Sequence, residues 1–170
     1  GCWQGGGGGA GRLYRNDDVT LAPGPQTVTI GAGGRGGVSG PNAGAPGSQG
    51  SSTIFNSVTM IGGGGGSTYN SPATTGGSGG GGGGGPGAHT DATPSVVTAV
   101  TNTDTPSSGA GNDGAEGQTA APHGAGGGGG AGGTATGGSA GTGGPGGLGI
   151  QLPSTFRDPA STVGYPSGSP

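Results

Sequence analysis

The stretch GGGGGGG at residues 79–85 decides the fold of this chain, and three shorter runs repeat it. These runs are Gly5–Gly9, Gly62–Gly66 and Gly126–Gly130. In all, 54 of the 170 residues are glycine. Glycine loses more backbone freedom on folding than any other residue, and it brings no side chain to a core. The chain must therefore stay disordered or bury backbone against backbone.

The rest of the composition leads to the same choice. Ile, Leu, Val and Phe together fall below the share that is typical of globular domains, so a conventional hydrophobic core cannot order the whole chain. The formal net charge is only −3, whereas many disordered chains are strongly charged. This combination indicates either a polar, close-packed backbone structure or low-complexity disorder.

Short apolar or β-branched stretches run directly into glycine three times, at residues 1–4, at Thr27–Ile30 and at the end of Thr53–Ile61. Enrichment in Val, Ile and Thr is typical of strands. We therefore expect short strands at Thr27–Ile30 and over Thr53–Ile61, each continuing into an extended glycine segment. Further strand candidates are Pro94–Thr103 and the stretch near Leu148–Leu152.

The glycine runs themselves can be flexible linkers or ordered polyproline-II-like helices. Such a helix has three residues per turn and no internal hydrogen bonds, so its backbone groups need partners on neighbouring segments. Without side chains, polyglycine can pack closely and bond to neighbours on all sides. We predict a mostly irregular, low-helix fold of packed polyglycine-II helices with a few short β-strands and projecting loops. A collagen triple helix is rejected, because glycine does not keep a strict period of three.

Glycine-poor segments separate the runs. Ala88–Ser108 is the longest and Ser67–Thr75 is shorter, and both are polar and turn-prone, as surface loops are. We divide the chain into a glycine-rich domain at 1–147, which carries these loops, and a part at 148–170. The latter is expected to hold a strand, a proline-bounded turn and a linker or repeat boundary. The start at Gly1 suggests a processed product or a fragment.

The patterns of most catalytic and binding classes are missing from the sequence. There is no lysine, and the four arginines are scattered, so we expect no nucleic-acid partner. No apolar run is long enough for membrane insertion. His89 and His123 lack ligand spacing and are expected in solvated loops, and Cys2 has no disulfide partner, so neither metal nor cofactor is predicted. No nucleophile elbow occurs, and we expect no enzymatic activity.

The two glycine-poor loops hold the candidate binding residues. The ring of Tyr69 can stack on a sugar or peptide, or it can lie over bare glycine backbone; both interpretations stay open. The polar stretches at residues 89–91 and 101–104 suit contacts with a surface. The candidate surface-binding residues are Tyr69, Asn70, His89, Asp91, Asn102 and Asp104.

Several phrases resemble the glycine-rich domain of bacteriophage tail-fibre proteins. LAPGPQTVTIGAGG at residues 21–34 is followed by STIF at 52–55 and by the glycine run at 62–66. The segment 149–162 is also similar to a segment of such fibres. The resemblance covers most of the chain and is weakest between residues 88 and 116.

This resemblance implies a virion fibre in which polyglycine helices form a rigid scaffold and variable loops contact the host. We therefore expect an adhesive domain, on the virion or extracellular, whose partner is a host cell-surface glycan or protein. Homo-oligomers are expected, because the edges of a glycine-helix bundle leave backbone groups unpaired. The alternative is a subunit of an extracellular glycine-rich filament with a purely structural role. An ice-binding protein would need regular threonine spacing, which the sequence lacks.

Overall fold

The computed structural model describes residues 4–14, 19–38, 44–68, 71–85 and 111–150. Within these ranges the chain forms no helix, and its strands are β1 (Val28–Thr29), β2 (Thr53–Phe55) and β3 (Val58–Met60). The low-helix fold with a few short strands is confirmed. The candidate strand at Pro94–Thr103 lies outside the described residues.

The three strands form one antiparallel sheet in the order β1-β2-β3. β1 confirms the strand expected at Thr27–Ile30, but the strand expected over Thr53–Ile61 is a hairpin. The chain turns at Asn56 and Ser57, whose φ angles are 46° and 63°. Two positive φ angles in a row are the mark of the type I′ turn, whose twist matches that of the flanking strands.

The expected strand near Leu148–Leu152 is not found in its described part, residues 148–150. There the carbonyl oxygen of Leu148 accepts a single hydrogen bond from the N–H of Gly132, at 2.7 Å, outside any ladder. Glycines on both sides of Leu148 leave no alternating side-chain pattern, which is what stabilises a strand pair.

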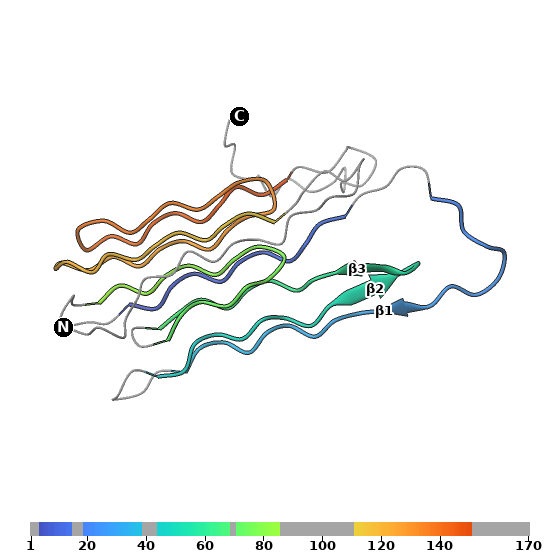
Figure 1. Cartoon of the computed structure of the whole chain (residues 1–170), viewed down its shortest axis with the longest axis horizontal. Helices are drawn as coiled ribbons and strands as arrows, with labels where there is room; N and C mark the ends of the chain where they lie inside the picture. The colour runs from blue at the N-terminus through green and yellow to red at the C-terminus, as the bar shows by residue number, and fades with distance from the viewer. Residues whose placement is uncertain (1–3, 15–18, 39–43, 69–70, 86–110, 151–170) are drawn as a thin grey trace, which may run out of the picture.

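Away from the sheet, the chain runs back and forth in long extended segments that lie side by side along the long axis of the molecule (Figure 1). β1 leads into segment 31–38, segment 44–51 leads into β2, and β3 leads into segment 60–68. The segments are joined by backbone hydrogen bonds between residues far apart in sequence.

These hydrogen bonds repeat every three residues, as segment 4–12 shows. The N–H of every third residue donates to segment 60–68, and the N–H of the residue that follows donates to segment 124–130. The first set is Gly6 to Ser67, Gly9 to Gly64 and Arg12 to Ile61, at 2.8–3.0 Å. The second is Gly7 to Gly126 and Ala10 to Gly129, at 3.1 and 3.0 Å. A β-strand would instead repeat every two residues.

Each segment also has neighbours on more than two sides, and these run in both directions. Segment 4–12 pairs antiparallel with 60–68 and with 76–85, and parallel with 124–130. Segment 76–85 in turn pairs parallel with 111–118, through the N–H groups of Gly79, Gly82 and Gly85. A strand in a sheet has at most two such neighbours, so the glycine segments form layers rather than one sheet.

The centre of this arrangement is backbone. Segments 76–82 and 124–130 are buried throughout, and the buried apolar side chains of the described residues are all alanines: Ala73, Ala115 and Ala125. A Cβ added at Gly6, Gly81 or Gly128 would lie within 3.0 Å of a carbonyl oxygen on a neighbouring segment. The segments can approach this closely only because these positions are glycine.

Candidate functional site

The six residues predicted as a binding surface, Tyr69, Asn70, His89, Asp91, Asn102 and Asp104, lie outside the described residues, as does loop 88–108. Part of loop 67–75 is described, and its described residues are hydrogen-bonded to each other and to glycine segment 60–68. The N–H of Thr68 donates to the carbonyl of Ser71 at 3.1 Å, and Thr74 exchanges two bonds with the backbone of Gly65. Within 67–68 and 71–75, only Pro72 and Thr75 are exposed.

A second projecting loop is described at residues 19–27, beyond the end of the sheet (Figure 1). Every residue from 19 to 30 is exposed, and Val19 and Leu21 are 40% and 42% exposed. Gly24, between two prolines, has a φ of 118°, which only glycine adopts without strain. The sequence indicates this turn through Pro23-Gly24-Pro25.

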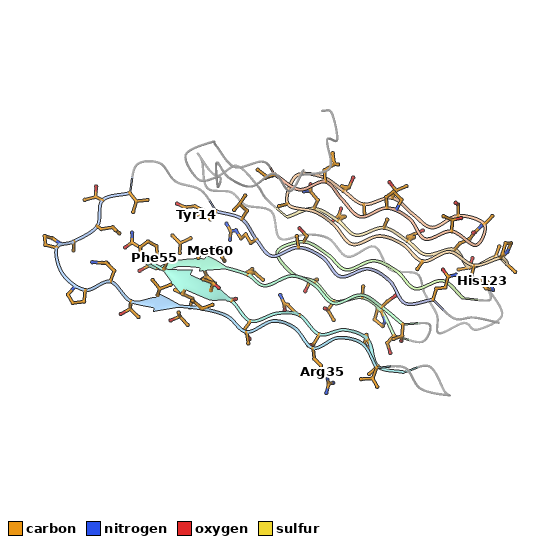
Figure 2. All side chains as sticks on the ribbon, turned by 180° about the vertical axis from the view of Figure 1, so that it is seen from behind. Tyr14, Arg35, Phe55, Met60 and His123 are labelled. Carbon is orange, nitrogen blue, oxygen red and sulfur yellow. The ribbon has the colours of Figure 1, made fainter. Side chains whose placement is uncertain are left out.

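An aromatic hollow of about 320 Å³ lies beside the hairpin turn. Tyr14, Phe55 and Met60, which Figure 2 places near one another, line it together with Val19 and other residues. Phe55 belongs to β2 and pairs with Val58 of β3. Tyr14 was missed, because nothing nearby in sequence marks it as facing the hairpin.

A larger groove, of about 1150 Å³, runs along the glycine segments. Four segments line it, namely residues 4–12, 31–38, 44–51 and 60–68. Its lining contains Arg12 and Arg35 and no carboxylate. The side chain of Arg35 extends outward from the ribbon in Figure 2.

Unpaired N–H groups point into this groove from segment 4–12. The carbonyls of Gln4, Gly7 and Ala10 accept bonds from segment 76–85, which lies behind the segment. In a trans peptide the N–H of the next residue points the opposite way. The N–H groups of Gly5, Gly8 and Gly11 therefore face the groove, where all three residues are exposed. Among the described residues none of these three has a hydrogen-bond partner.

Segment 60–68 adds a second row of donors by the same geometry. Its Gly62 and Gly65 carbonyls accept bonds from Gly77 and Thr74, so the N–H groups of Gly63 and Gly66 point away from that side. Every carbonyl from Ile61 to Ser67 already accepts a hydrogen bond. Segment 60–68 thus offers donors without acceptors, whereas the carbonyls of segment 4–12 at residues 5, 6, 8, 9 and 11, which also line the groove, accept no hydrogen bond among the described residues.

One polar cluster is buried at the centre of the scaffold. Ser78 is fully buried, and its Oγ donates to the carbonyl of Gly130 at 3.2 Å while accepting from the N–H of Asn112 at 3.3 Å. The Nδ2 of Asn112 donates to the same carbonyl at 2.7 Å. The three groups are joined to one another, so this cluster ties three segments together.

The part of the chain that the structure describes holds no group of three His, Cys, Asp or Glu side chains that could bind a metal ion, and no helix that could cross a membrane. His123, expected in solvent, is half-buried at one end of the scaffold (Figure 2).

Comparison of the chain with protein-family models, with curated proteins and with solved structures gives no match. The functional argument therefore depends on the geometry of the scaffold, the loops and the groove.

Proposed function

We propose that the glycine segments are polyglycine-II helices and that they form a rigid scaffold for displayed loops. The observation that carries this proposal is the three-residue period of the hydrogen bonds between segments. A polyproline-II-type helix has three residues per turn and no internal hydrogen bonds, so successive residues face three different neighbours. At about 3.1 Å per residue, segment 4–12 spans about 28 Å.

We further propose that this scaffold is the adhesive, non-enzymatic domain of a phage tail fibre, on the virion or extracellular. Loop 19–27 is exposed and lies at one end of the long extended segments, which is a position from which a loop can contact another surface. Loops 67–75 and 88–108 would contact a host cell-surface glycan or protein through several weak polar contacts, with several copies per particle raising the avidity. The likeness of residues 21–34 and 52–55 to tail-fibre domains supports this assignment.

Binding to cells tests the adhesive role. The labelled whole chain is incubated with a panel of bacterial strains, and bound protein is measured by flow cytometry. We expect saturable binding to some strains, and loss of that binding when residues 88–108 are replaced by a Gly-Ser linker of equal length. Thr119→Ala, on an exposed turn outside the loops, is the control. Unchanged binding after the loop exchange contradicts the proposal in this form.

The alternative, a subunit of an extracellular filament, rests on the unpaired backbone groups in the groove. Such a subunit would polymerise and bind no cell strain. Light scattering combined with the same cell-binding assay separates the two functions.

A further inference from the structure

We propose that the aromatic hollow beside the hairpin turn binds a neutral sugar that carries a methyl group, such as an N-acetylhexosamine or a deoxyhexose. This ligand class rests on the adhesive role proposed above, and it narrows the host-surface partner to a glycan. Ligand pockets in proteins measure about 300–1,000 Å³. The hollow, at about 320 Å³, therefore has room for one small ring rather than for a long segment of a partner.

The sheet supplies three walls of the hollow. In β2 and β3, Phe55 pairs with Val58, and Thr53 pairs with Met60. Because side chains alternate between the two faces of a strand, Phe55, Val58 and Met60 lie on one face of the sheet. All three are half-buried, whereas Ile54 on the opposite face is 41% exposed. The hollow therefore lies on the more covered face of the sheet.

Tyr14 supplies a further wall from the end of segment 4–14. The N–H of Arg12 donates to the carbonyl of Ile61 at 2.8 Å, which places the end of this segment beside β3. Tyr14 follows two residues later, is half-buried, and lies near Phe55 and Met60 (Figure 2). Walls that are in place before the ligand arrives lower the ordering cost of binding.

The hollow is apolar at its half-buried walls and polar at its exposed rim. The half-buried lining residues are Tyr14, Phe55, Val58 and Met60. Thr20 and Asn56 also line the hollow, and both are exposed. A hydroxyl group placed among apolar side chains gives up water for few partners, which costs free energy. The ligand therefore needs an apolar group for the walls and hydrogen-bonding groups for the rim.

The charge of the lining narrows the ligand further. Among the described residues, no charged side chain lines the hollow, so an ionic ligand would lose its water without gaining an opposite charge. A neutral sugar has C–H groups on the faces of its ring, which can pack on aromatic side chains, and hydroxyl groups at its edge. A methyl group on the sugar adds apolar area that leaves water on binding.

The hollow is also accessible to a glycan on another surface. Val19 and Thr20 line it and begin loop 19–27, which is exposed throughout. This loop projects at the end of the scaffold that carries the sheet (Figure 1). One sugar of a longer glycan can therefore reach the hollow without entering the packed glycine segments.

The methyl group of Met60 provides a direct probe, because Met60 is the only methionine of the chain. The whole chain is isotope-labelled at this methyl group and titrated with sugars while its NMR resonance is followed. N-acetylglucosamine and quinovose carry a methyl group, glucose lacks one, and glucuronic acid carries a charge. We expect a saturable shift with the first two, about fourfold weaker binding of glucose, and no binding of glucuronic acid.

Two variants separate the walls from the rim. Phe55→Leu keeps an apolar side chain but removes the aromatic face, and it is expected to weaken sugar binding about two- to tenfold. Thr20→Val removes a rim hydroxyl at nearly constant shape, with an expected loss of about two- to tenfold. Thr59→Val is the matched control, because Thr59 is exposed on the opposite face of β3. Circular dichroism with thermal melting checks that each variant folds.

Three results would overturn the proposal. They are the absence of a saturable Met60 shift with both methyl-bearing sugars, equal binding of glucuronic acid, and sugar binding that is unchanged in both Phe55→Leu and Thr20→Val. A Met60 shift with indole but with neither sugar would assign the hollow to an apolar ligand instead.

Cell binding separates this proposal from the adhesive role. If the chain binds cells but no sugar shifts the Met60 resonance, the sugar site fails and the adhesive role stands. If sugars shift the resonance but the chain binds no bacterial strain, the adhesive role fails and the hollow remains a sugar site.

Discussion

The small sheet and the glycine segments are both extended backbone but differ in how many neighbouring segments they bond to. In β2 and β3, residues carry side chains, and each strand has partners only in the plane of the sheet. Where β3 continues into segment 60–68, the side chains end and the backbone bonds to three neighbouring segments. A segment without Cβ atoms can therefore have more neighbouring segments than a strand that carries side chains.

The largest expected effect comes from adding a side chain where segments touch. Gly128→Ala places a methyl group within 3.0 Å of the carbonyl of Gly8 and of the next backbone nitrogen. Overpacking against rigid backbone is expected to cost about 3 kcal/mol of unfolding free energy. Urea denaturation measures it.

The matched control is Gly33→Ala, because a Cβ at Gly33 meets nothing within 4 Å. It is expected to leave stability unchanged or raise it by about 0.4–1 kcal/mol, by restricting the unfolded chain. Equal losses in both variants would contradict the idea that contact between segments, rather than glycine content, holds the fold.

A smaller effect is expected from the buried cluster in the glycine layers. Ser78→Ala removes the acceptor of the Asn112 N–H and one donor to the Gly130 carbonyl. An unsatisfied buried group costs about 1–3 kcal/mol, so the free energy of unfolding measured in urea is expected to fall by that amount. Ser48→Ala, whose Oγ accepts the exposed N–H of Arg35, is the control and should lose less.

The smallest effect is expected in the sheet. Ser57→Gly relieves a residue held at a φ of 63°, and glycine adopts this region freely. The free energy of unfolding should rise by about 0.5–1 kcal/mol, in line with the αL strain removed. Ser57→Val should lower it, because β-branched residues tolerate positive φ poorly. If both changes have the same sign, the turn differs from the one described.

Sequence reasoning predicts the low-helix fold and the start of β1, because Val28 and Thr29 stand among β-branched neighbours. It misses the hairpin turn, because Asn56-Ser57 lacks the glycine that usually marks a type I′ turn. The partners of Ser78 were also missed, because they come from segments distant in sequence. The sequence of a glycine run does not reveal its packing. Gly8 and Gly9 are neighbours of the same type, yet a Cβ at Gly8 would have its nearest atom at 3.6 Å, whereas one at Gly9 would lie within 3.0 Å of the backbone of Ser78.

Sequence reasoning is equally limited for the candidate binding residues. Their polar character suggested two loops, but the positions that would test the contacts lie outside the described residues. The groove left no trace in the sequence, because it is lined by backbone groups whose direction depends on the register of distant segments.

An alanine scan of residues 5, 6, 8, 9 and 11, followed by urea denaturation of each whole-chain variant, tests the central claim most directly. The claim is that glycine segments pack with a period of three. Stability should be kept in Gly5→Ala, Gly8→Ala and Gly11→Ala, whose methyl groups would have their nearest atoms at 3.5–3.8 Å. It should be lost in Gly6→Ala and Gly9→Ala, whose methyl groups would lie within 3.0 Å of neighbouring backbone. A loss that alternates every two residues, or one that is uniform along the run, would contradict the account.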